Sequence, residues 1–268
     1  MNDVRDLVVL VTGGSNGIGA GIVRTVLARG AKHVVILDIN ITQGQALEAE
    51  LNSKYGINKV KFIKCDVASN ELHAAFEEAV QLFGYLDVVI NNAGIMNDSP
   101  KVYEKEITIN VTAVITGSLK AFEIMRKDRN GKGGTIVNIS SVVALIQSSL
   151  LPVYSATKSA VLQFSNCLGK IETYNRTGVR VVTVCFGATD TSLIVKVGCI
   201  DKELEEMVPA AMEKMPLQGV DAAVSGLIHA FENGASGSTW LVTSGRPAEE
   251  ITGNVTKAYE ILSQGVYK

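Results

Sequence analysis

Short apolar runs rich in β-branched residues recur along the chain, and each is typical of a buried strand. Segments with a helical spacing of apolar residues separate the first five runs. This strict alternation predicts an α/β fold, in which helices cover both faces of a parallel sheet. The expected strands are Leu7–Val11, His33–Leu37, Val60–Ile63, Leu86–Ile90, Thr135–Ile139, Val179–Cys185 and Thr239–Val242, and the expected helices between them are Ile18–Leu27, Ala46–Leu51, Leu72–Phe83 and Val111–Met125.

Glycines mark the ends of these helices. Gly30 and Gly84 follow the first and third, and the glycine cluster at 131–134 separates the fourth helix from its strand, as is common at helix C-termini. With no repeat or low-complexity linker in the sequence, we expect one domain over residues 1–268. The strand rhythm lapses over residues 187–219, which combine Leu, Ile, Val and Met with charges. That segment is either a lid over a substrate or a plain amphipathic surface helix.

Composition and charge restrict the class of ligand. Hydrophobic residues make up 47% of the chain and charged residues 19%, with a net charge of -2. Because the charges are spread along the sequence, no basic patch directs the protein to nucleic acid or to an anionic membrane. A small neutral or weakly charged ligand is the better match.

Cysteine and histidine usage points away from disulfides and metals. The four cysteines form no C-x-x-C pair, which favours a reducing compartment. The first apolar run is far shorter than a membrane span of about 20 residues, so we expect a cytoplasmic protein. The three histidines lack ligand spacing, so we expect no metal site. A Gly-x-Ser-x-Gly motif is missing from the sequence, which gives a serine hydrolase no support.

A glycine-rich turn follows the first expected strand and opens the first expected helix. Its glycines let backbone amides approach a pyrophosphate, and the helix N-terminus adds partial positive charge. The alternative is a glycine-rich turn that binds no ligand. The residues expected to contact a dinucleotide here are Gly13, Ser15, Asn16, Gly17, Ile18 and Gly19.

Asp38 ends the second expected strand and indicates which dinucleotide binds. Its carboxylate can accept hydrogen bonds from the adenosine ribose and would repel a 2′-phosphate. Since the glycine turn holds no Lys or Arg and Ile39 follows, NAD is favoured over NADP. The alternative role of Asp38 is to cap the helix that begins near Gln43, and both roles can coexist.

Polar residues also follow the third and fourth expected strands. The carboxyl ends of parallel strands form the crevice in which open α/β sheets bind ligands. We therefore expect Asp66 near the adenine amino group and the N-N-A-G segment beside the ribose. The cofactor-binding residues predicted at these ends are Asp66, Val67, Asn91, Asn92, Ala93 and Gly94.

Tyr154 and Lys158 form a Y-x-x-x-K pair at the start of a helical segment. The i,i+4 spacing places the phenol and the ammonium on one helix face. Alone, such a pair is usually part of a plain surface helix. Its significance comes from Ser141, which ends the fifth expected strand, and from Asn110 in the preceding helix. All of these elements finish at the edge that carries the glycine turn.

Alcohol oxidation needs these residue types. A base that takes the hydroxyl proton needs a pKa near working pH, whereas the pKa of an ordinary tyrosine is about 10. We expect the Lys158 ammonium, together with a positive nicotinamide, to lower the pKa of Tyr154. Ser141 can donate to the substrate oxygen. Asn110 can hold a water that passes the proton from Lys158 to solvent, or its amide can simply bond a neighbouring carbonyl.

Taken together, these motifs resemble the short-chain dehydrogenase/reductase family over essentially the whole chain. The T-G-x-x-x-G-I-G turn, Asp38, C-D-V, N-N-A-G, Asn110, N-I-S-S and Y-x-x-x-K occur in the family's order. The resemblance implies a single-domain Rossmann fold, a doubly wound parallel sheet of seven strands. It places the catalytic tetrad on Asn110, Ser141, Tyr154 and Lys158, with Tyr154 and Lys158 also contacting NAD.

The resemblance also implies a nicotinamide clamp and a substrate surface. The clamp falls on Gly187, Thr189 and Thr191, although this chain has Phe186 where the family usually has proline. Phe186 can instead pack on the nicotinamide. Substrate contacts are expected from Ser141, Val143, Tyr154 and Phe186.

Within the family, Asp38, the Pro152-Val153-Tyr154 approach and the tail from Ser238 to Gly245 are similar to insect-type alcohol dehydrogenases and 15-hydroxyprostaglandin dehydrogenase-like proteins. By the same resemblance, helices that start near Val102 and Pro152 would pair across a two-fold axis. We therefore expect a homodimer or homotetramer.

The expected activity is that of an NAD-dependent alcohol dehydrogenase or ketone reductase. The apolar loop after the fifth strand, residues 142–146, and the possible lid favour an apolar secondary alcohol or its ketone. The competing hypothesis is a non-catalytic NAD sensor or interaction protein on the same fold. The tetrad argues against it, because a sensor has no physical need for both Tyr154 and Lys158.

Overall fold

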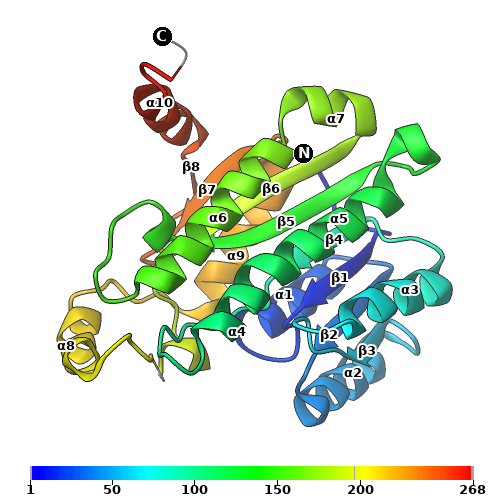
Figure 1. Cartoon of the computed structure of the whole chain (residues 1–268). Helices are drawn as coiled ribbons and strands as arrows, with labels where there is room; N and C mark the ends of the chain where they lie inside the picture. Colours follow the sequence, from blue (N-terminus) through cyan, green and yellow to red (C-terminus); the bar gives the residue numbers. More distant parts are fainter. Residues whose placement is uncertain (1, 196, 267–268) are drawn as a thin grey trace.

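All strands join one sheet in the computed structural model, which describes residues 2–195 and 197–266. The strand order is β3-β2-β1-β4-β5-β6-β7-β8, and every pairing is parallel except that of β7 with β8. Figure 1 shows the sheet running behind α6, α5 and α3. The strands are β1 Val8–Thr12, β2 His33–Asp38, β3 Val60–Lys64, β4 Val88–Asn91, β5 Gly134–Ser141, β6 Val179–Phe186, β7 Ser238–Val242 and β8 Glu249–Glu250.

Ten α-helices and four shorter helical segments connect the strands in the described part of the chain. The longer helices follow strands, as the alternating sequence pattern predicts. The α-helices are α1 Gly17–Ala28, α2 Ile41–Tyr55, α3 Glu71–Phe83, α4 Tyr103–Ile107, α5 Ala113–Met125, α6 Pro152–Leu168, α7 Ile171–Thr177, α8 Lys202–Glu213, α9 Val220–Asn233 and α10 Thr252–Leu262. The shorter segments are the π-helix η1 Thr108–Thr112 and the 3₁₀ turns η2 Lys127–Arg129, η3 Val142–Ala144 and η4 Ser192–Ile194.

The predicted doubly wound α/β fold is confirmed, but the strand count of seven is wrong. The eighth strand, β8, has two exposed residues, both glutamates, and pairs antiparallel with β7. A strand this short and polar has no apolar alternation, so nothing in the hydrophobic pattern indicates it.

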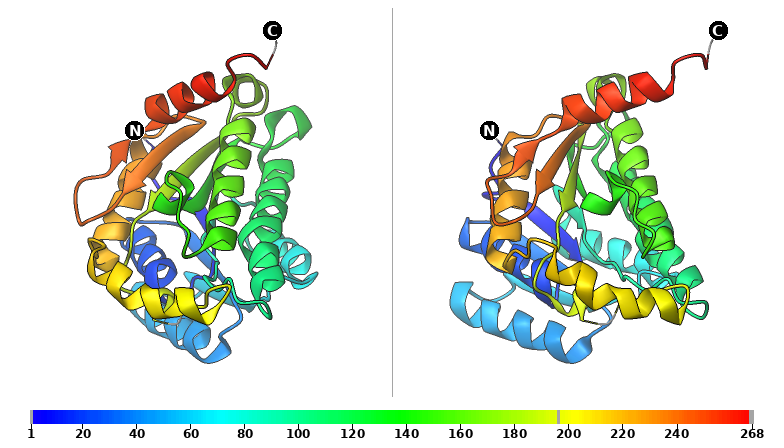
Figure 2. Two further views of the ribbon diagram at one scale, coloured as in Figure 1. Left: turned by 60° about the vertical axis from the view of Figure 1, so that its left-hand side comes forward. Right: turned by 90° about the vertical axis from the view of Figure 1, so that its left-hand side faces the viewer.

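Burial of both sheet faces explains the apolar strands. In β1, Val9 and Val11 join the core that includes α1 and α9, whereas Val8 and Leu10 join the core that includes α3 and α5. Successive side chains of a strand point to opposite faces, so a strand covered on both sides needs apolar residues throughout. Figure 2 shows the helices in layers on either side of the strands.

The helix run over residues 103–125 is long and apolar enough, by length and composition, to cross a membrane. It consists of α4, η1 and α5 and packs on β4 and β5 of the sheet. Its interior side carries the buried polar residues Glu106, Asn110 and Ser118. Packing on the sheet accounts for its apolar composition.

Topology determines where a ligand can bind. β1 and β4 are neighbours in the sheet. From β1 the next strands along the chain, β2 and β3, are added on one side, whereas from β4 the next strands are added on the other side. In open α/β sheets the crevice at this switch point, beside the carboxyl ends of the strands, is the ligand site. The glycine turn after β1, the N-N-A-G segment after β4 and Ser141 at the end of β5 all lie at this edge.

The contact between α2 and β3 gives a test of the packing. A Cβ added at Gly44 would lie 2.2 Å from the ring of Phe62, which is only 7% exposed. Overpacking of this kind costs about 1–3 kcal/mol, which outweighs the helix propensity that alanine gains, about 1 kcal/mol. We expect Gly44→Ala to lower the free energy of unfolding in urea titrations.

Gly253 in α10 is the matched control, because an added Cβ there meets nothing within 4 Å. Gly253→Ala should leave stability unchanged or raise it by up to about 1 kcal/mol. Equal effects of the two substitutions would contradict the packing of α2 against Phe62.

Candidate active site

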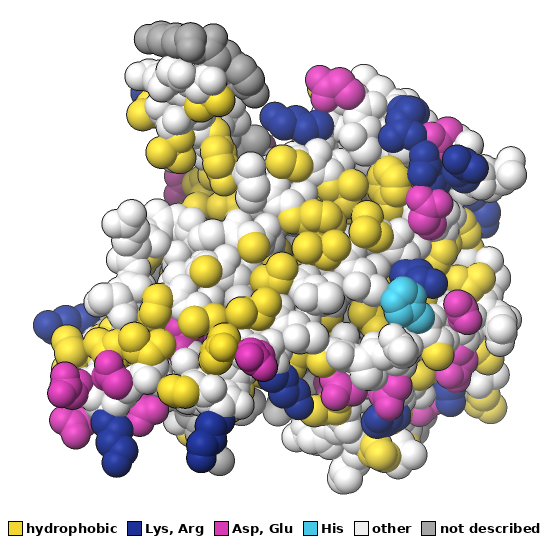
Figure 3. All heavy atoms as spheres, in the orientation of Figure 1, with side chains coloured by type: hydrophobic (Ala, Val, Ile, Leu, Met, Phe, Trp, Pro, Cys, Tyr) yellow, Lys and Arg dark blue, Asp and Glu magenta, His cyan; other side chains and the backbone are white. Residues whose placement is uncertain are grey.

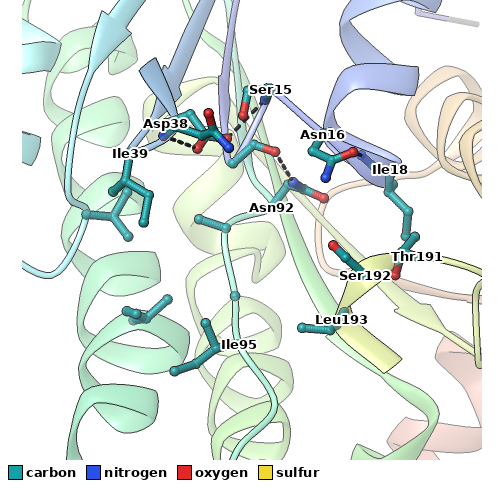
Figure 4. A pocket seen from close by; sticks show the side chains of 18 of the residues that line it. Ser15, Asn16, Ile18, Asp38, Ile39, Asn92, Ile95, Thr191, Ser192 and Leu193 are labelled. Carbon is teal, nitrogen blue, oxygen red and sulfur yellow. Dashed lines mark hydrogen bonds between the residues drawn. The ribbon is translucent and has the colours of Figure 1, made fainter. Parts of the chain in front are cut away.

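Two adjoining cavities occupy the carboxyl edge of the sheet. The larger cavity, of about 570 Å³, lies along the ends of β1, β2, β3 and β4. The smaller cavity, of about 170 Å³, lies between the end of β5, α6 and α8. Ile18, Asn92, Gly94 and Thr191 line both cavities, so the two are continuous. Figure 4 shows the larger cavity, with Asp38, Asn16 and Thr191 around it.

The glycine turn is shaped to bring backbone close to a ligand. Gly13 and Gly17 have φ angles of 62° and 51°, a region that glycine adopts without strain. A Cβ on Gly19 would lie 2.0 Å from the carbonyl oxygen of Gly13. The turn therefore closes only with glycine at position 19, and it opens α1 with its N-terminus at the cavity.

Ser15 supplies a polar group that lacks a protein partner. Its hydroxyl oxygen is buried and forms no hydrogen bond in the described structure, although Ser15 lines the larger cavity. A buried hydroxyl without a partner is costly. A phosphate at the α1 N-terminus would satisfy it, so the residues present fit the pyrophosphate of a dinucleotide.

Asp38 connects β2 to the glycine turn. One carboxylate oxygen accepts from the Ser15 amide at 3.0 Å, and the other accepts from the Asn40 amide at 2.9 Å. The alternative role as a helix cap belongs to Asn40, whose side chain accepts from the Gln43 amide and caps α2. Asp38 and Ile39 both line the larger cavity, where the carboxylate is available to ribose hydroxyls.

The two asparagines at the end of β4 have different surroundings. The Asn92 side chain donates to the carbonyl oxygens of Thr12 and Gly13, at 3.0 Å each, and lines both cavities. The Asn91 side chain instead donates to Ser118 and Asn138 in the interior. Asn91 lies outside both cavities, whereas Asn92 ties the β1 turn to the β4 loop.

Asn110 lies in the π-helix η1 and is completely buried. Its side-chain oxygen accepts from the Ile95 amide at 2.9 Å, and its NH₂ group donates to the Ile95 carbonyl and to the Thr157 hydroxyl. π-Helical bulges in a longer helix are frequent at functional sites. The geometry matches the alternative of an amide bonded to a neighbouring carbonyl, which fixes the loop after β4 against α6.

Tyr154, Lys158 and Ser141 meet at the wall of the smaller cavity. All three are buried and line it. The Lys158 ammonium lies 5.6 Å from the centre of the Tyr154 ring and donates to the Ile139 carbonyl at 3.1 Å. Gly94 completes the group, because a Cβ there would lie 3.2 Å from the Asn110 oxygen and 3.6 Å from the Lys158 nitrogen.

Burial controls the protonation of this group. Burial raises the pKa of Tyr154, opposed by a hydrogen bond with Ser141 and reinforced by the charge of Glu106. Burial also lowers the pKa of Lys158 to about 8. These directions hold for the protein without NAD, where loss of hydration disfavours the phenolate. That Lys158 together with a positive nicotinamide lowers the pKa of Tyr154 stays a prediction.

The smaller cavity is mainly apolar. The predicted substrate contacts Ser141, Val143, Tyr154 and Phe186 all line it. Phe186 ends β6 and also packs in the core. Between β6 and α8, Gly187, Thr189 and Thr191 line the cavity as well, and the Thr189 hydroxyl donates to the Gly187 carbonyl at 3.0 Å.

The segment 187–219 contains η4 and α8, and its Lys196 lies outside the described residues. Val208, Ala211 and Met212 of α8 line the smaller cavity. The opposite side of α8 is charged. Asp201 caps the N-terminus of the helix, where its side chain accepts from the Leu204 amide at 2.9 Å. The helix is thus amphipathic, and its apolar side faces the cavity, as a lid requires.

Sequence reasoning missed several lining residues. Ile95 and Met96 line both cavities, directly after the N-N-A-G motif. Extending the motif by two residues would have found them. Lys105 lines the larger cavity from α4, and no local pattern indicates it. Leu193, which belongs to the segment expected to form a lid or a surface helix, lines both cavities.

Sequence comparisons find a matching family and several similar proteins. The profile of the short chain dehydrogenase family matches residues 7–198. The 15-hydroxyprostaglandin dehydrogenase [NAD(+)] of Rattus norvegicus is 32% identical over 250 residues, 91% of this chain and 93% of the relative. The Bos taurus protein of the same name is 34% identical over 251 residues, 91% and 93% of the two chains. Alcohol dehydrogenase 1 of Ceratitis cosyra is 36% identical over 188 residues, 69% and 71% of the two chains.

The position of Asp38 predicts how the site discriminates between dinucleotides. Removing its charge in Asp38→Asn should tighten NADPH binding relative to NADH by about 10-fold or more, because two charges about 4 Å apart repel by up to about 4 kcal/mol near a protein surface. Fluorescence titration with each reduced dinucleotide gives the ratio of dissociation constants.

Asp66 is the matched control, since it lines the same cavity but at the end of β3. Asp66→Asn should leave the NADPH to NADH ratio near that of the wild type. An unchanged ratio in Asp38→Asn would exclude Asp38 as the group that rejects a 2′-phosphate.

Proposed function

We propose that this chain, which belongs to the short-chain dehydrogenase family, interconverts an apolar secondary alcohol and its ketone. As a family member it is an NAD-dependent oxidoreductase. The observation that carries the proposal is the burial of Tyr154, Lys158 and Ser141 together at the wall of the smaller cavity. A substrate in the smaller cavity would place its hydroxyl beside the phenol and beside a nicotinamide at the mouth of the larger cavity.

The proton step belongs to Tyr154. In the oxidation direction its phenolate takes the proton of the substrate hydroxyl as the carbinol carbon loses a hydride, and in reduction the phenol returns that proton. Bound NAD supplies the hydride acceptor and a positive charge near the phenol. Ser141 donates to the substrate oxygen and stabilises the charge that develops there.

Lys158 assists the phenolate. Its pKa of about 8 leaves it mainly protonated at neutral pH, where its charge favours the phenolate. Asn110 forms hydrogen bonds with Ile95 and Thr157. Through them it fixes the position of the loop after β4 relative to the helix α6. These two side chains therefore support Tyr154 in different ways, one by charge and one by geometry.

The smaller cavity supports an apolar substrate. Lys158 is the one ionisable cation among the described residues that line it, and most of the others are Leu, Ile, Val, Met and Ala. A substrate carboxylate placed deep in this cavity would lose its hydration without a free partner. Uncharged alcohols with hydrocarbon bodies fit the lining best.

A homodimer or homotetramer remains a prediction of the family resemblance. Figure 3 shows hydrophobic side chains gathered over the face that carries α5 and α6. Leu119 on α5 is 47% exposed and Ile107 on α4 is 41% exposed. An exposed apolar face favours burial against a second copy.

Replacing Tyr154 by Phe separates an enzyme from a sensor. We expect Tyr154→Phe to lower kcat/KM by about 10²- to 10⁴-fold, the range for loss of a general acid or base, while NADH binding changes little. The measurement is NADH formation with a panel of secondary alcohols, together with fluorescence titration of NADH.

Tyr103→Phe serves as the control, since Tyr103 is 37% exposed and is not one of the residues that line the smaller cavity. It should retain wild-type turnover. Wild-type protein that binds NADH but oxidises no alcohol in the panel would instead favour the non-catalytic sensor.

The lining by α8 predicts a preference for longer alcohols. Each buried methylene contributes about 0.8 kcal/mol, so kcat/KM should rise about 3- to 4-fold per methylene along a series of 2-alkanols until the cavity is filled. Met212→Ala should reduce this slope, because Met212 lines the cavity.

Met207→Ala is the control on the same helix, because Met207 is 56% exposed and does not line the cavity. It should leave the chain-length slope unchanged. A wild-type slope of zero would contradict an apolar substrate site.

A further inference from the structure

Glu106 is a buried carboxyl group that the proposed reaction does not use. It lies on α4 and is completely buried. One of its oxygens accepts from the Asn97 amide at 2.9 Å, and the other is buried with no hydrogen-bond donor in the described structure. Glutamate is almost never fully buried unless it is paired, so this side chain needs a structural reason.

Asp98 is the group beside it, and it caps the catalytic helix. Asp98 is 1% exposed, and its two oxygens accept from the amides of Val153 at 2.6 Å and Tyr154 at 2.9 Å. Helix α6 has Leu151 at its own cap position and no side-chain cap there. Asp98 therefore supplies the missing cap from the loop after β4, and it bonds directly to the residue that carries the phenol.

The same loop is bonded to the segment that leads to the lid. The Asp98 amide donates to the Gly198 carbonyl at 2.8 Å, and Asn97 and Gly198 form a parallel bridge. A Cβ on Gly198 would lie 2.2 Å from the Asn97 side-chain oxygen. Residues 97 and 98 thus connect α4, the start of α6 and the approach to α8.

A single proton makes this pair of carboxyl groups compatible. Burial and a hydrogen bond with Asp98 raise the pKa of Glu106 to about 8. Both oxygens of Asp98 already accept from backbone amides, whereas one oxygen of Glu106 has no donor. A proton on the unpartnered oxygen of Glu106 would give that oxygen a hydrogen bond to Asp98.

We propose that Glu106 is a positioning residue. As a neutral carboxylic acid bonded to Asp98, it fixes the loop after β4, and this loop in turn holds Tyr154 and the segment that leads to α8. The role in turnover rests on the proposed function. The hydrogen bonds themselves do not, because they exist in the protein alone.

Ionisation of Glu106 would oppose this arrangement. A second negative charge repels Asp98, and the charge of Glu106 raises the pKa of both Tyr154 and Lys158. Those two groups face Glu106 from α6, and Asp98 faces it from the loop. Its neighbours on α4, Glu104 and Lys105, are exposed, and Cys199 lies on the Asp98 side. Activity should therefore fall above about pH 8, as Glu106 ionises.

Glu106→Gln tests the proposal, because glutamine keeps the neutral donor and the acceptor but cannot ionise. The ratio of its kcat/KM to that of the wild type should stay within about 2-fold at pH 7 and rise by up to about 30-fold at pH 9.5, where a group with a pKa of about 8 is mostly ionised. Glu104→Gln, an exposed site on the same helix, should give a ratio that does not vary with pH.

Stability provides a readout that does not depend on turnover. A carboxyl whose pKa is raised on folding binds more protons in the native state than in the unfolded state between about pH 4.5 and 8, so its contribution to stability falls as pH rises through that range. The stability of Glu106→Gln relative to the wild type should therefore increase from pH 5 to 8 and then level off. Denaturant titrations at several pH values measure it.

Wild-type protein supplies a check if the variant does not fold. Infrared spectra should show a protonated-carboxyl band at pH 7 that disappears with a midpoint near pH 8, and the lack of such a band would overturn the proposal. A relative stability that does not vary with pH would overturn it too. If the stability and infrared predictions hold but the wild type oxidises no alcohol, the proposed function is refuted. In that case only the catalytic part of this inference falls with it.

Discussion

Burial of a parallel sheet on both faces is the constraint on which this molecule depends. Strands such as β1 and β6 are buried along their whole length, so polar groups are confined mainly to the ends of strands. All parallel strands of this sheet end at one edge, and the side chains that we propose to bind and react are gathered there. The fold thus brings together residues as distant as Asp38, Ser141 and Tyr154 without any long-range sequence signal.

That same burial creates the central electrostatic problem of the site. Loss of water disfavours both a tyrosine phenolate and a lysine ammonium, and the shifts of Tyr154 and Lys158 have those directions. In the proposed reaction, the Ser141 hydroxyl, the Lys158 charge and the charge of bound NAD compensate for this loss. The carboxyl groups of Glu106 and Asp98 add negative charge beside them, so the proton they share matters to the same balance.

Much of this arrangement could be predicted from the sequence, because the signals were local. Apolar runs located seven of the eight strands, and the glycine turn, Asp38 and the Y-x-x-x-K pair lie at the expected edge. What escaped prediction depends on tertiary contacts. A buried Glu106 looks like any surface glutamate on a helix, and the two-residue β8 has no hydrophobic pattern. Asn91 and Asn92 are adjacent, yet alternation at the strand end turns the Asn91 side chain into the interior and the Asn92 side chain toward the cavities. The direction of the Tyr154 shift required knowing how completely the phenol is buried.

The most direct test of the account is an ultraviolet titration of tyrosine ionisation in the NAD complex, compared between wild-type protein and Tyr154→Phe. The account predicts that NAD makes one phenol ionise well below the ordinary tyrosine pKa of about 10, and that this transition is missing in Tyr154→Phe. A wild-type NAD complex in which no tyrosine ionises below about pH 9, while alcohol is still oxidised at neutral pH, would contradict Tyr154 as the base.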